Sequence, residues 1–326
     1  MVDDIPIHYF AAHRRFFLSP SMARALSQQL TQFDLLHIHG IWTFPTLCAA
    51  RLAQKFRVPY VVSPRGTLIP WARHHKKWRK QFYFHVLEKN HLQRASALHF
   101  TTSFEQHHCP STLQKSQNFV VANPIDTSWF HAIKPLGTFY ETPKLAMVGR
   151  LHPVKGFDLM FKVLCELKTK YPAVRLSIVG SDNDRYQERL VTLLQQLEMI
   201  DAVEFVGLVD RQRLQWTLEG CYALVVPSHQ ESFGLQAAEA MALGRPVIVS
   251  DQVALAREIQ QHQLGAVSPL DVRSFYDAIV EVIDNYNKTQ AFVTNAHEYA
   301  WGNFYYLKTA EKLLQQYSEL LDSKAA

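Results

Sequence analysis

Two carboxylates, Glu231 and Glu239, lie eight positions apart within the segment 225–251. The segment has the pattern of a buried strand, a short polar loop, a helix opened by Ser232-Phe233-Gly234, and a second strand. Along a helix, eight residues would separate the two backbones by roughly 12 Å. This is about the span of a sugar diphosphate-ribose unit, and the free N–H groups of the helix start would face an anion between them. The pattern predicts a nucleotide-sugar site, although a solvated helix face would carry the same residues.

A basic loop follows the predicted strand that begins at Lys144. The strand ends at Gly149-Arg150, and Lys155 lies five residues further on, before a periodic run that predicts a helix over 157–171. Arg150 offers a planar fork to a phosphate, and Lys155 offers a point charge. The pattern GxxxxGK[ST] of the nucleoside-triphosphate loop is absent. Each basic residue taken alone would fit a solvated strand end equally well.

The letters GRL…KG from Gly149 and PS…ESFGL…EAMALGRPVI from Pro227 resemble the retaining nucleotide-sugar glycosyltransferases of family 4, the "group 1" set with the GT-B fold. The resemblance is close over 144–250 and looser over 34–40 and 123–126. It implies an α/β, GT-B-like fold with two Rossmann-like parallel-sheet domains that face a cleft. The alternation of predicted strands and helices along the chain is typical of such sheets.

The resemblance also implies a role for each motif residue. Arg150 and Lys155 would hold the donor diphosphate, Glu239 would hold the ribose hydroxyls, and Glu231 would hold hydroxyls of the transferred sugar. His39 occupies the position of the family's active-site histidine. The predicted catalytic residues are His39, Arg150, Lys155 and Glu231. The predicted donor-binding residues are Gly149, Arg150, Lys155, Ser232, Phe233, Gly234, Leu235 and Glu239.

No metal or cofactor is expected beyond the nucleotide-diphosphate sugar that serves as donor substrate. Arg150 and Lys155 would neutralise the leaving diphosphate, which a divalent cation does in other enzymes. The pairs His74-His75 and His107-His108 have no carboxylate or cysteine partner at ligand spacing. The resemblance implies retention of the anomeric configuration. No motif position carries an evident covalent nucleophile, so attack on the same face is the expected route.

Two further features concern the acceptor side. His37 and His39 are expected to face opposite sides of their strand, with His39 towards the cleft and His37 in the core. The second feature is the stretch 65–80, which has six Lys or Arg residues and no acid. On a helix from Pro70 its aromatic residues would form one face, which suits anionic lipid or a lipid-diphosphate acceptor. An aromatic stripe in the core with a solvated basic face is the alternative. The predicted acceptor or membrane contacts are Arg65, Arg73, Lys76, Lys77 and Trp78.

Composition sets the remaining expectations. The chain has 326 residues, 48% hydrophobic and 19% charged, which is enough for two domains with cores. We predict an N-terminal acceptor-side domain over 1–137, a nucleotide-sugar-binding domain over 138–300, and a helix over 301–326 that crosses back to the first domain. A net charge of +5 without a recognisable motif does not favour nucleic acid. Four scattered cysteines and no apolar run of roughly 18 residues predict a cytoplasmic protein. The basic segment 65–80 predicts peripheral contact with the inner face of the membrane.

The start of the chain departs from the family pattern. Residues 1–10 have the pattern of a strand, and the glycine-rich loop that usually follows the first strand of the family is absent, since the first glycine is Gly40. The N-terminal domain is therefore expected to be incomplete, with an exposed sheet edge and an incomplete acceptor side.

The motifs predict a glycosyltransferase that moves a hexose-type sugar from a nucleotide-diphosphate sugar to a glycan or lipid-linked acceptor. The sequence SPRGTL preceded by HGIW resembles family members of exopolysaccharide assembly, which implies a role in polysaccharide biosynthesis. The alternative is a catalytically inactive nucleotide-sugar-binding remnant or partner subunit, which the departure at the N-terminus would explain. An epimerase of the same architecture fits the paired motifs less well.

Overall fold

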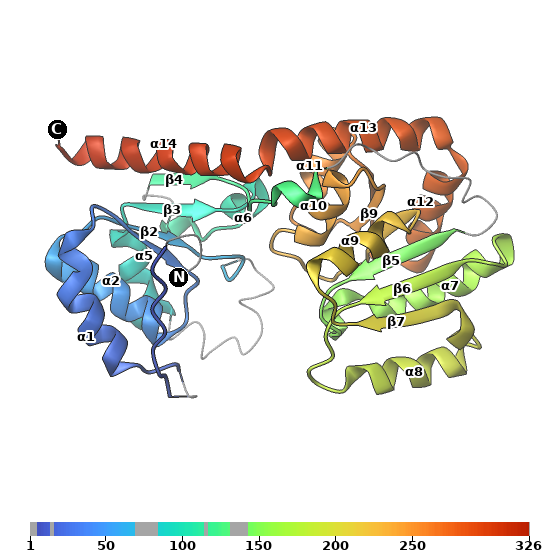
Figure 1. Cartoon of the computed structure of the whole chain (residues 1–326), viewed down its shortest axis with the longest axis horizontal. Coiled ribbons are helices and arrows are strands. Elements are labelled where there is room, and N and C mark those ends of the chain that lie inside the picture. The colour runs from blue at the N-terminus through green and yellow to red at the C-terminus, as the bar shows by residue number, and fades with distance from the viewer. Residues whose placement is uncertain (1–4, 14–15, 69–83, 114–116, 131–142, 326) are drawn as a thin grey trace. The chain divides into compact units, whose positions relative to one another are not determined.

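The computed structural model describes residues 5–13, 16–68, 84–113, 117–130 and 143–325. The chain divides into two compact units, each with its own parallel sheet (Figure 1). The first unit contains residues 1–121 and 311–326, and the second contains residues 122–310. The predicted boundaries were at 137 and 300.

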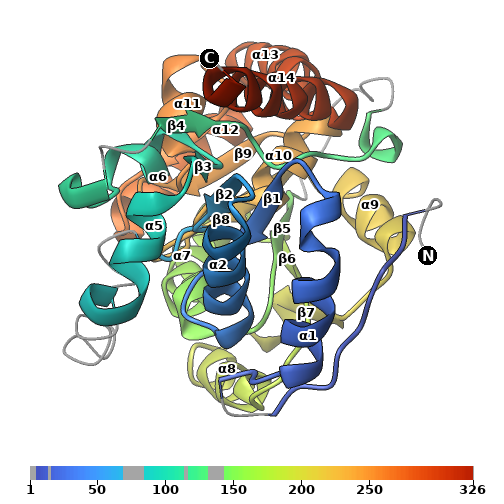
Figure 2. The same ribbon diagram turned by 90° about the vertical axis from the view of Figure 1, so that its left-hand side faces the viewer.

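The sheet of the first unit has four parallel strands in the order β1-β2-β3-β4. Figure 2 shows helices α1 and α2 side by side in front of these strands. The strands are β1 (Leu36–His39), β2 (Tyr60–Ser63), β3 (Ala97–Phe100) and β4 (Gln117–Val120). The helices are α1 (Pro20–Gln29), α2 (Phe44–Phe56), a π-helical turn (Phe84–Glu88), α5 (Lys89–Arg94) and α6 (Ser103–His107).

Successive residues of these strands enter opposite cores, as the period of two requires. Tyr60 and Val62 of β2 pack towards the helix side, where α2 supplies Ala49, Ala50 and Ala53. Val61 faces the other side and packs with Leu320. Leu320 belongs to α14 (Tyr306–Ala325), the last helix of the chain, whose part from residue 311 is included in the first unit.

Strand β1 forms one edge of this sheet. Within the described ranges it pairs with β2 alone. β1 is therefore an edge strand within the described part of the chain. Of the strand expected over 1–10, residues 6–10 form no strand. The absence of a glycine-rich loop and helix from the protein stays a prediction.

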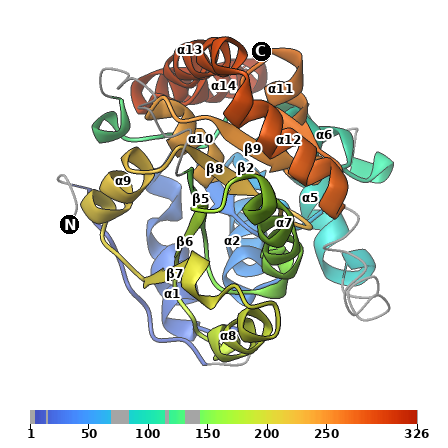
Figure 3. The ribbon, with the colours of Figure 1, turned by 90° about the vertical axis from the view of Figure 1, so that its right-hand side faces the viewer.

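The sheet of the second unit has six parallel strands in the order β10-β9-β8-β5-β6-β7. Figure 3 shows α7 and α8 beside strands β6 and β7 of this sheet. The strands are β5 (Lys144–Val148), β6 (Arg175–Val179), β7 (Val203–Gly207), β8 (Ala223–Val226), β9 (Val247–Ser250) and β10 (Ala266–Ser268). The helices are α7 (Phe157–Lys170), α8 (Tyr186–Gln196), α9 (Arg211–Glu219), α10 (Leu235–Ala242), α11 (Ala256–Gln261), α12 (Val272–Asp284) and α13 (Tyr286–Asn303).

Helices cover both faces of this sheet, so its central strands are mostly apolar. Alternate strand residues, such as Leu145 and Met147, join a core with α7, α8 and α12. The residue between them, Ala146, joins a second core with α10 and α13. Helix α10 presents four fully buried alanines, which lets its backbone lie close to the sheet and to α13.

The alternating pattern of the sequence predicts nine strands outside the N-terminus, over 34–39, 60–63, 97–102, 119–122, 145–149, 175–180, 203–207, 223–227 and 247–250. Each is present, with ends that differ by at most two residues. The tenth strand, β10, was not predicted because it has only three residues and contains no long apolar run. The helix predicted from Pro70 lies outside the described residues.

Candidate active site

The loop after β5 is shaped by two glycines. Gly156 has a φ of +71°, and a Cβ there would lie 2.0 Å from the carbonyl oxygen of Pro227. Gly149 has a φ of +142°, and a Cβ there would lie 2.8 Å from both Cε and Nζ of Lys155. The glycines therefore allow the loop to pass against the loop after β8 and leave room for the lysine side chain.

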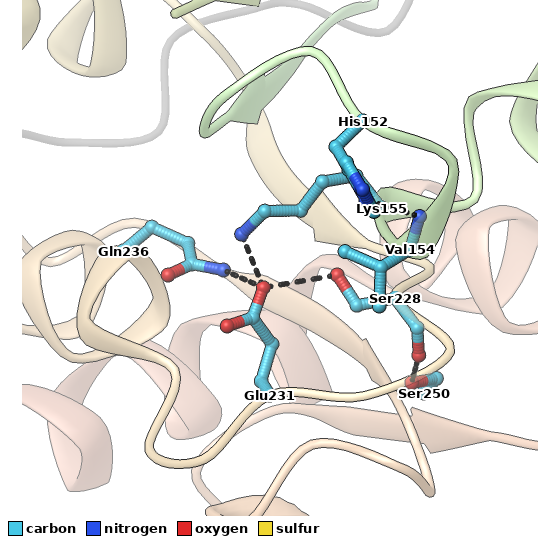
Figure 4. Close-up of polar contacts among 7 residues, drawn as sticks. All are labelled: His152, Val154, Lys155, Ser228, Glu231, Gln236 and Ser250. Atoms are coloured by element: carbon cyan, nitrogen blue, oxygen red, sulfur yellow. Dashed lines mark hydrogen bonds and ion pairs between the residues drawn. The ribbon is translucent and has the colours of Figure 1, made fainter. Parts of the chain in front are cut away.

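The two loops bring Lys155 and Glu231 together, 76 positions apart in sequence (Figure 4). The ammonium of Lys155 forms an ion pair with Oε1 of Glu231, and each side chain is 16% exposed. The backbone amide of His229 donates to the carbonyl oxygen of Val154 at 2.8 Å, which ties one loop to the other. The sequence predicted both residues for the site but did not predict that they contact each other.

Two further side chains complete this cluster. Ser228 Oγ and Gln236 Nε2 each donate to Oε1 of Glu231 at 3.2 Å. Within the described part of the chain, all recorded hydrogen bonds of this carboxylate use Oε1, which leaves Oε2 to accept hydrogen bonds from a ligand. The sequence placed Ser228 at the carboxyl end of a predicted strand without giving it a role, and sequence reasoning missed Gln236. A buried glutamine in a helix of alanines was the available signal.

Helix α10 begins three residues later than predicted. Gly234, with a φ of +97°, is its N-cap residue, and Leu235 is its first residue. Glu239 therefore lies about one turn into the helix, and the predicted 12 Å separation does not apply because residues 231–234 are not helical. A Cβ on Gly234 would lie 2.8 Å from Cγ1 of Val253, so packing as well as backbone conformation favours glycine here.

The start of α10 has the properties of an anion site. The helix has no side-chain N-cap, and the amides of Gly234, Leu235 and Gln236 have no acceptor among the residues that the structure describes. Gln236 also contacts Glu231, so these amides lie close to the Lys155–Glu231 pair. Unpaired amides and the positive end of the helix dipole attract negative charge.

The other predicted donor residues differ in what they offer to a ligand. The side chain of Arg150 is exposed, and Ser232 is half-buried. Phe233 is buried, with its ring centroid 5.6 Å from that of Phe304, so only its backbone is available. Leu235 is 42% exposed.

Glu239 lies outside the hydrogen-bonded cluster of Glu231. Burial raises the pKa of its carboxyl to about 7, and the nearby Arg211 of α9 opposes this shift. Arg211 also forms an ion pair with Asp126 at 3.1 Å. A carboxyl with a pKa near neutrality costs little to protonate, so it can pair with ligand hydroxyls as an acceptor or a donor.

In the first unit, His39 ends β1 and contacts Arg65, which follows β2. The Arg65 guanidinium donates to Nδ1 of His39 at 2.9 Å. The expectation that His37 and His39 face opposite sides is wrong, since their ring centroids lie 4.2 Å apart. Residues two positions apart in a strand share a face, so both rings must lie on one side.

His37 and His39 line an apolar cavity of about 440 Å³ beside the outer edge of β1. Phe10, Met22 and Phe33 are among the apolar residues of its wall. Of the predicted acceptor contacts, only Arg65 belongs to the described part of the chain. Arg73, Lys76, Lys77 and Trp78 lie outside it.

Within the described residues, no group of three or more histidine, cysteine, aspartate or glutamate side chains has the geometry to hold a metal ion. No helix in the same residues has both the length and the apolar character needed to span a bilayer. Membrane contact through the basic segment stays a prediction.

Comparison with known families gives matches over both units. Residues 132–299, just over half of the chain, match the family described as glycosyl transferases group 1. Residues 1–121 match the glycosyl transferase 4-like domain.

Curated relatives match over somewhat more than half of the chain. The chain is 31% identical over 192 residues to D-inositol 3-phosphate glycosyltransferase of Nocardia farcinica, which covers 57% of this chain and 42% of that protein. It is 30% identical over 200 residues to glycogen synthase of Mycobacterium tuberculosis, which covers 61% of this chain and 47% of that protein. The chain thus spans less than half the length of these relatives.

Solved structures show the same fold over nearly the whole chain. Sucrose-phosphate synthase from Thermosynechococcus elongatus has a TM-score of 0.78 at 20% identity, covering 98% of this chain and 82% of that one. Anabaena Alr3699/HepE in complex with UDP-glucose also has a TM-score of 0.78 at 20% identity, covering 97% of this chain and 86% of that one. These likenesses confirm the predicted α/β class with two Rossmann-like parallel-sheet domains of the GT-B type.

Proposed function

We propose a transferase activity for this chain, which belongs to the glycosyl transferases group 1 family. In this proposal the protein transfers a hexose-type sugar from a nucleoside-diphosphate sugar to an acceptor hydroxyl. The observation that carries this proposal is the Lys155–Glu231 pair at the uncapped start of α10. It combines a cation and free amides for a diphosphate with a carboxylate for sugar hydroxyls, all held by loops at strand ends, where ligands of parallel sheets bind.

The pair can bind two chemically different parts of the donor at once. An ammonium has three N–H groups, so Lys155 can keep one on Glu231 and offer others to phosphate oxygens. Oε2 of Glu231 remains to accept hydrogen bonds from sugar hydroxyls. Arg150 is exposed and reaches solvent from the same loop, where its planar fork suits a second phosphate contact.

The proposed reaction breaks the bond between the anomeric carbon and the phosphate oxygen of the donor. The acceptor hydroxyl forms the new bond to that carbon on the same face, and its proton passes to the departing phosphate oxygen. Lys155, Arg150 and the amides of Gly234 and Leu235 would stabilise the charge that develops on the diphosphate. Glu231 would orient the sugar, and Glu239 would bind the ribose hydroxyls. His39 would contact the sugar.

UDP-glucose is the first donor to test, because one structure of the same fold was determined in complex with it. The acceptor is a glycan or a lipid-linked glycan in this proposal, with a role in polysaccharide assembly. The basic segment 65–80 supports an anionic acceptor such as a lipid diphosphate.

The test is release of nucleoside diphosphate from labelled UDP-, GDP- and ADP-sugars in the presence of hydroxyl acceptors. We expect turnover with one nucleotide class, and an anomeric configuration in the product, determined by NMR, that matches the donor. Tight donor binding without turnover on any acceptor would instead indicate a catalytically inactive binding protein.

A further inference from the structure

We infer that Arg65 is a positioning residue for His39, which it holds in the tautomer that carries its proton on Nε2. His39 then offers a hydrogen-bond donor to its ligand. The identity of that ligand, an oxygen of the sugar or the acceptor, rests on the proposed function. The assignment of the tautomer does not.

The direction of the hydrogen bond follows from the chemistry of arginine. One terminal N–H of Arg65 lies 2.9 Å from Nδ1 of His39, and its Nε lies 3.3 Å from the same nitrogen. A guanidinium has five donors and no acceptor, and it stays protonated in proteins. Nδ1 must therefore accept, and the proton of the neutral ring must be on Nε2.

Arg65 is held in place by a buried carboxylate. Glu105 of α6 is fully buried, and it accepts hydrogen bonds from the amide of Gly66 and from the amide and hydroxyl of Thr101, the last two at 3.0 and 3.1 Å. Thr67 adds a hydrogen bond from its hydroxyl to the carbonyl oxygen of Pro64 at 2.6 Å. The turn that carries Arg65 is therefore fixed to β3 and α6.

The backbone of Arg65 supports a functional reason for this arrangement. Its φ is +54°, a left-handed conformation that is uncommon for a residue with a side chain. The conformation persists because the surrounding hydrogen bonds determine it, and it directs the guanidinium onto the ring of His39.

The surroundings of His39 keep the ring neutral. Partial burial and the Arg65 guanidinium lower the pKa of His39. The groups that face it are Arg65 from the turn, His37 from its own strand and His99 from β3. Burial lowers the pKa of His37 to about 3 and that of His99 to about 4, so neither adds a positive charge near neutral pH.

His37 has its own partners and does not compete for Arg65. Its Nδ1 shares a hydrogen bond with the hydroxyl of Tyr317, and its Nε2 lies 3.4 Å from Nδ1 of His99. His99 in turn uses Nε2 on the carbonyl oxygen of Val121 at 2.8 Å. His39 is therefore the histidine of this group whose tautomer depends on Arg65.

The test is a long-range ¹H–¹⁵N spectrum of the imidazole rings of the full ¹⁵N-labelled chain, with His39 assigned by His39→Gln. In the wild-type chain at neutral pH we expect His39 to be neutral with its proton on Nε2. A proton on Nδ1, or a charged ring at pH 7, would overturn the inference. This measurement needs no substrate, so loss of the proposed function would not affect it.

Substitution of Arg65 then tests its part in this arrangement. In Arg65→Met we expect a mixture of tautomers, a raised pKa of His39 and a kcat lowered on the order of tenfold, with little change in KM for the donor. Arg65→Lys should retain the Nε2–H tautomer in part. It also replaces Arg65→Met as the test variant if Arg65→Met does not fold.

The matched control is Arg57→Met. Arg57 is exposed and has nearly the same left-handed backbone, with a φ of +59°. This control separates loss of the contact with His39 from the cost of placing Met in that conformation. A His39 tautomer and titration that are unchanged in Arg65→Met, with the chain folded, would contradict the inference.

Discussion

The Lys155–Glu231 site and the His39–Arg65 site control charge in opposite ways. In the second unit a cation and a carboxylate form a direct ion pair, each only 16% exposed. In the first unit a guanidinium lies against an imidazole ring, and burial together with this guanidinium lowers the pKa of the ring. The first arrangement suits a ligand with an anionic part and a hydroxyl part. The second suits a neutral oxygen that accepts a hydrogen bond.

The supports of the two sites differ as well. The loops of Lys155 and Glu231 are attached to a six-stranded sheet with cores on both faces. His39 ends β1, an edge strand in the described part of a four-stranded sheet, and its position depends on the turn that Glu105 holds. The difference shows that one site is fixed mainly by close packing and the other mainly by hydrogen bonds.

Removal of the Lys155 ammonium from the proposed donor site should have the largest effect. In Lys155→Ala the developing charge of the diphosphate loses a stabilising group, and Glu231 loses its ion-pair partner. We expect turnover to fall on the order of a hundredfold, as when one oxyanion donor is lost. Steady-state kinetics would measure this, with the exposed Lys162→Ala of α7 as the control. A near wild-type rate in both variants would remove Lys155 from the proposed role.

Close packing of the donor-site loop can be tested by adding a single methyl group. Gly156→Ala would place its Cβ 2.0 Å from the carbonyl oxygen of Pro227, whereas Gly207→Ala would meet nothing within 4 Å at a similar φ of +79°. Both variants have the strain of a left-handed alanine. We expect the free energy of unfolding, measured with urea, to fall about 2 kcal/mol further for Gly156→Ala. Equal losses would contradict the packing argument.

The raised pKa of Glu239 predicts a pH dependence of stability. The folded chain binds this proton more tightly than the unfolded chain, whose carboxyl has the usual pKa of 4.5. The contribution of this protonated carboxyl to the free energy of unfolding is therefore fully present below about pH 4.5 and is lost as the pH rises through about 7. Between about pH 5 and pH 8 we expect the wild-type chain to lose on the order of 1 kcal/mol more stability than Glu239→Gln. Parallel curves in urea unfolding would argue against the shift.

The smallest expected effect is that of a chelator. Because Arg150 and Lys155 would neutralise the diphosphate, we expect EDTA to leave turnover unchanged within about twofold. Activity that is lost with EDTA and restored with manganese would show that these two residues do not suffice.

The residues of the proposed donor site could be predicted from local sequence. Gly149, Arg150, Lys155 and Glu231 lie in short motifs at strand ends, and parallel sheets gather such ends at one edge. Contacts that depend on the tertiary structure could not be predicted from the sequence. The ion pair between Lys155 and Glu231, and its support by Gln236, result from the approach of two loops far apart in sequence.

Three sequence expectations failed for identifiable reasons. The opposite placement of His37 and His39 contradicts the period of two in a strand, which the structure obeys. The prediction that α10 begins at Ser232 did not take into account that Gly234 adopts a left-handed backbone and is the N-cap residue. The pattern of residues 1–10 resembles a strand, but residues 6–10 form none. Apolar residues alone do not make a strand, and within the described residues 6–10 no partner strand is paired.

The most direct test of the central claim is a calorimetric titration of UDP-, GDP- and ADP-sugars into the wild-type chain and Glu239→Ala. The account predicts selective binding of one nucleotide class by the wild-type chain and at least a tenfold weaker association in the variant. Binding that is equal in the two proteins, or no binding by a folded wild-type sample, would contradict a nucleotide-sugar site at the start of α10.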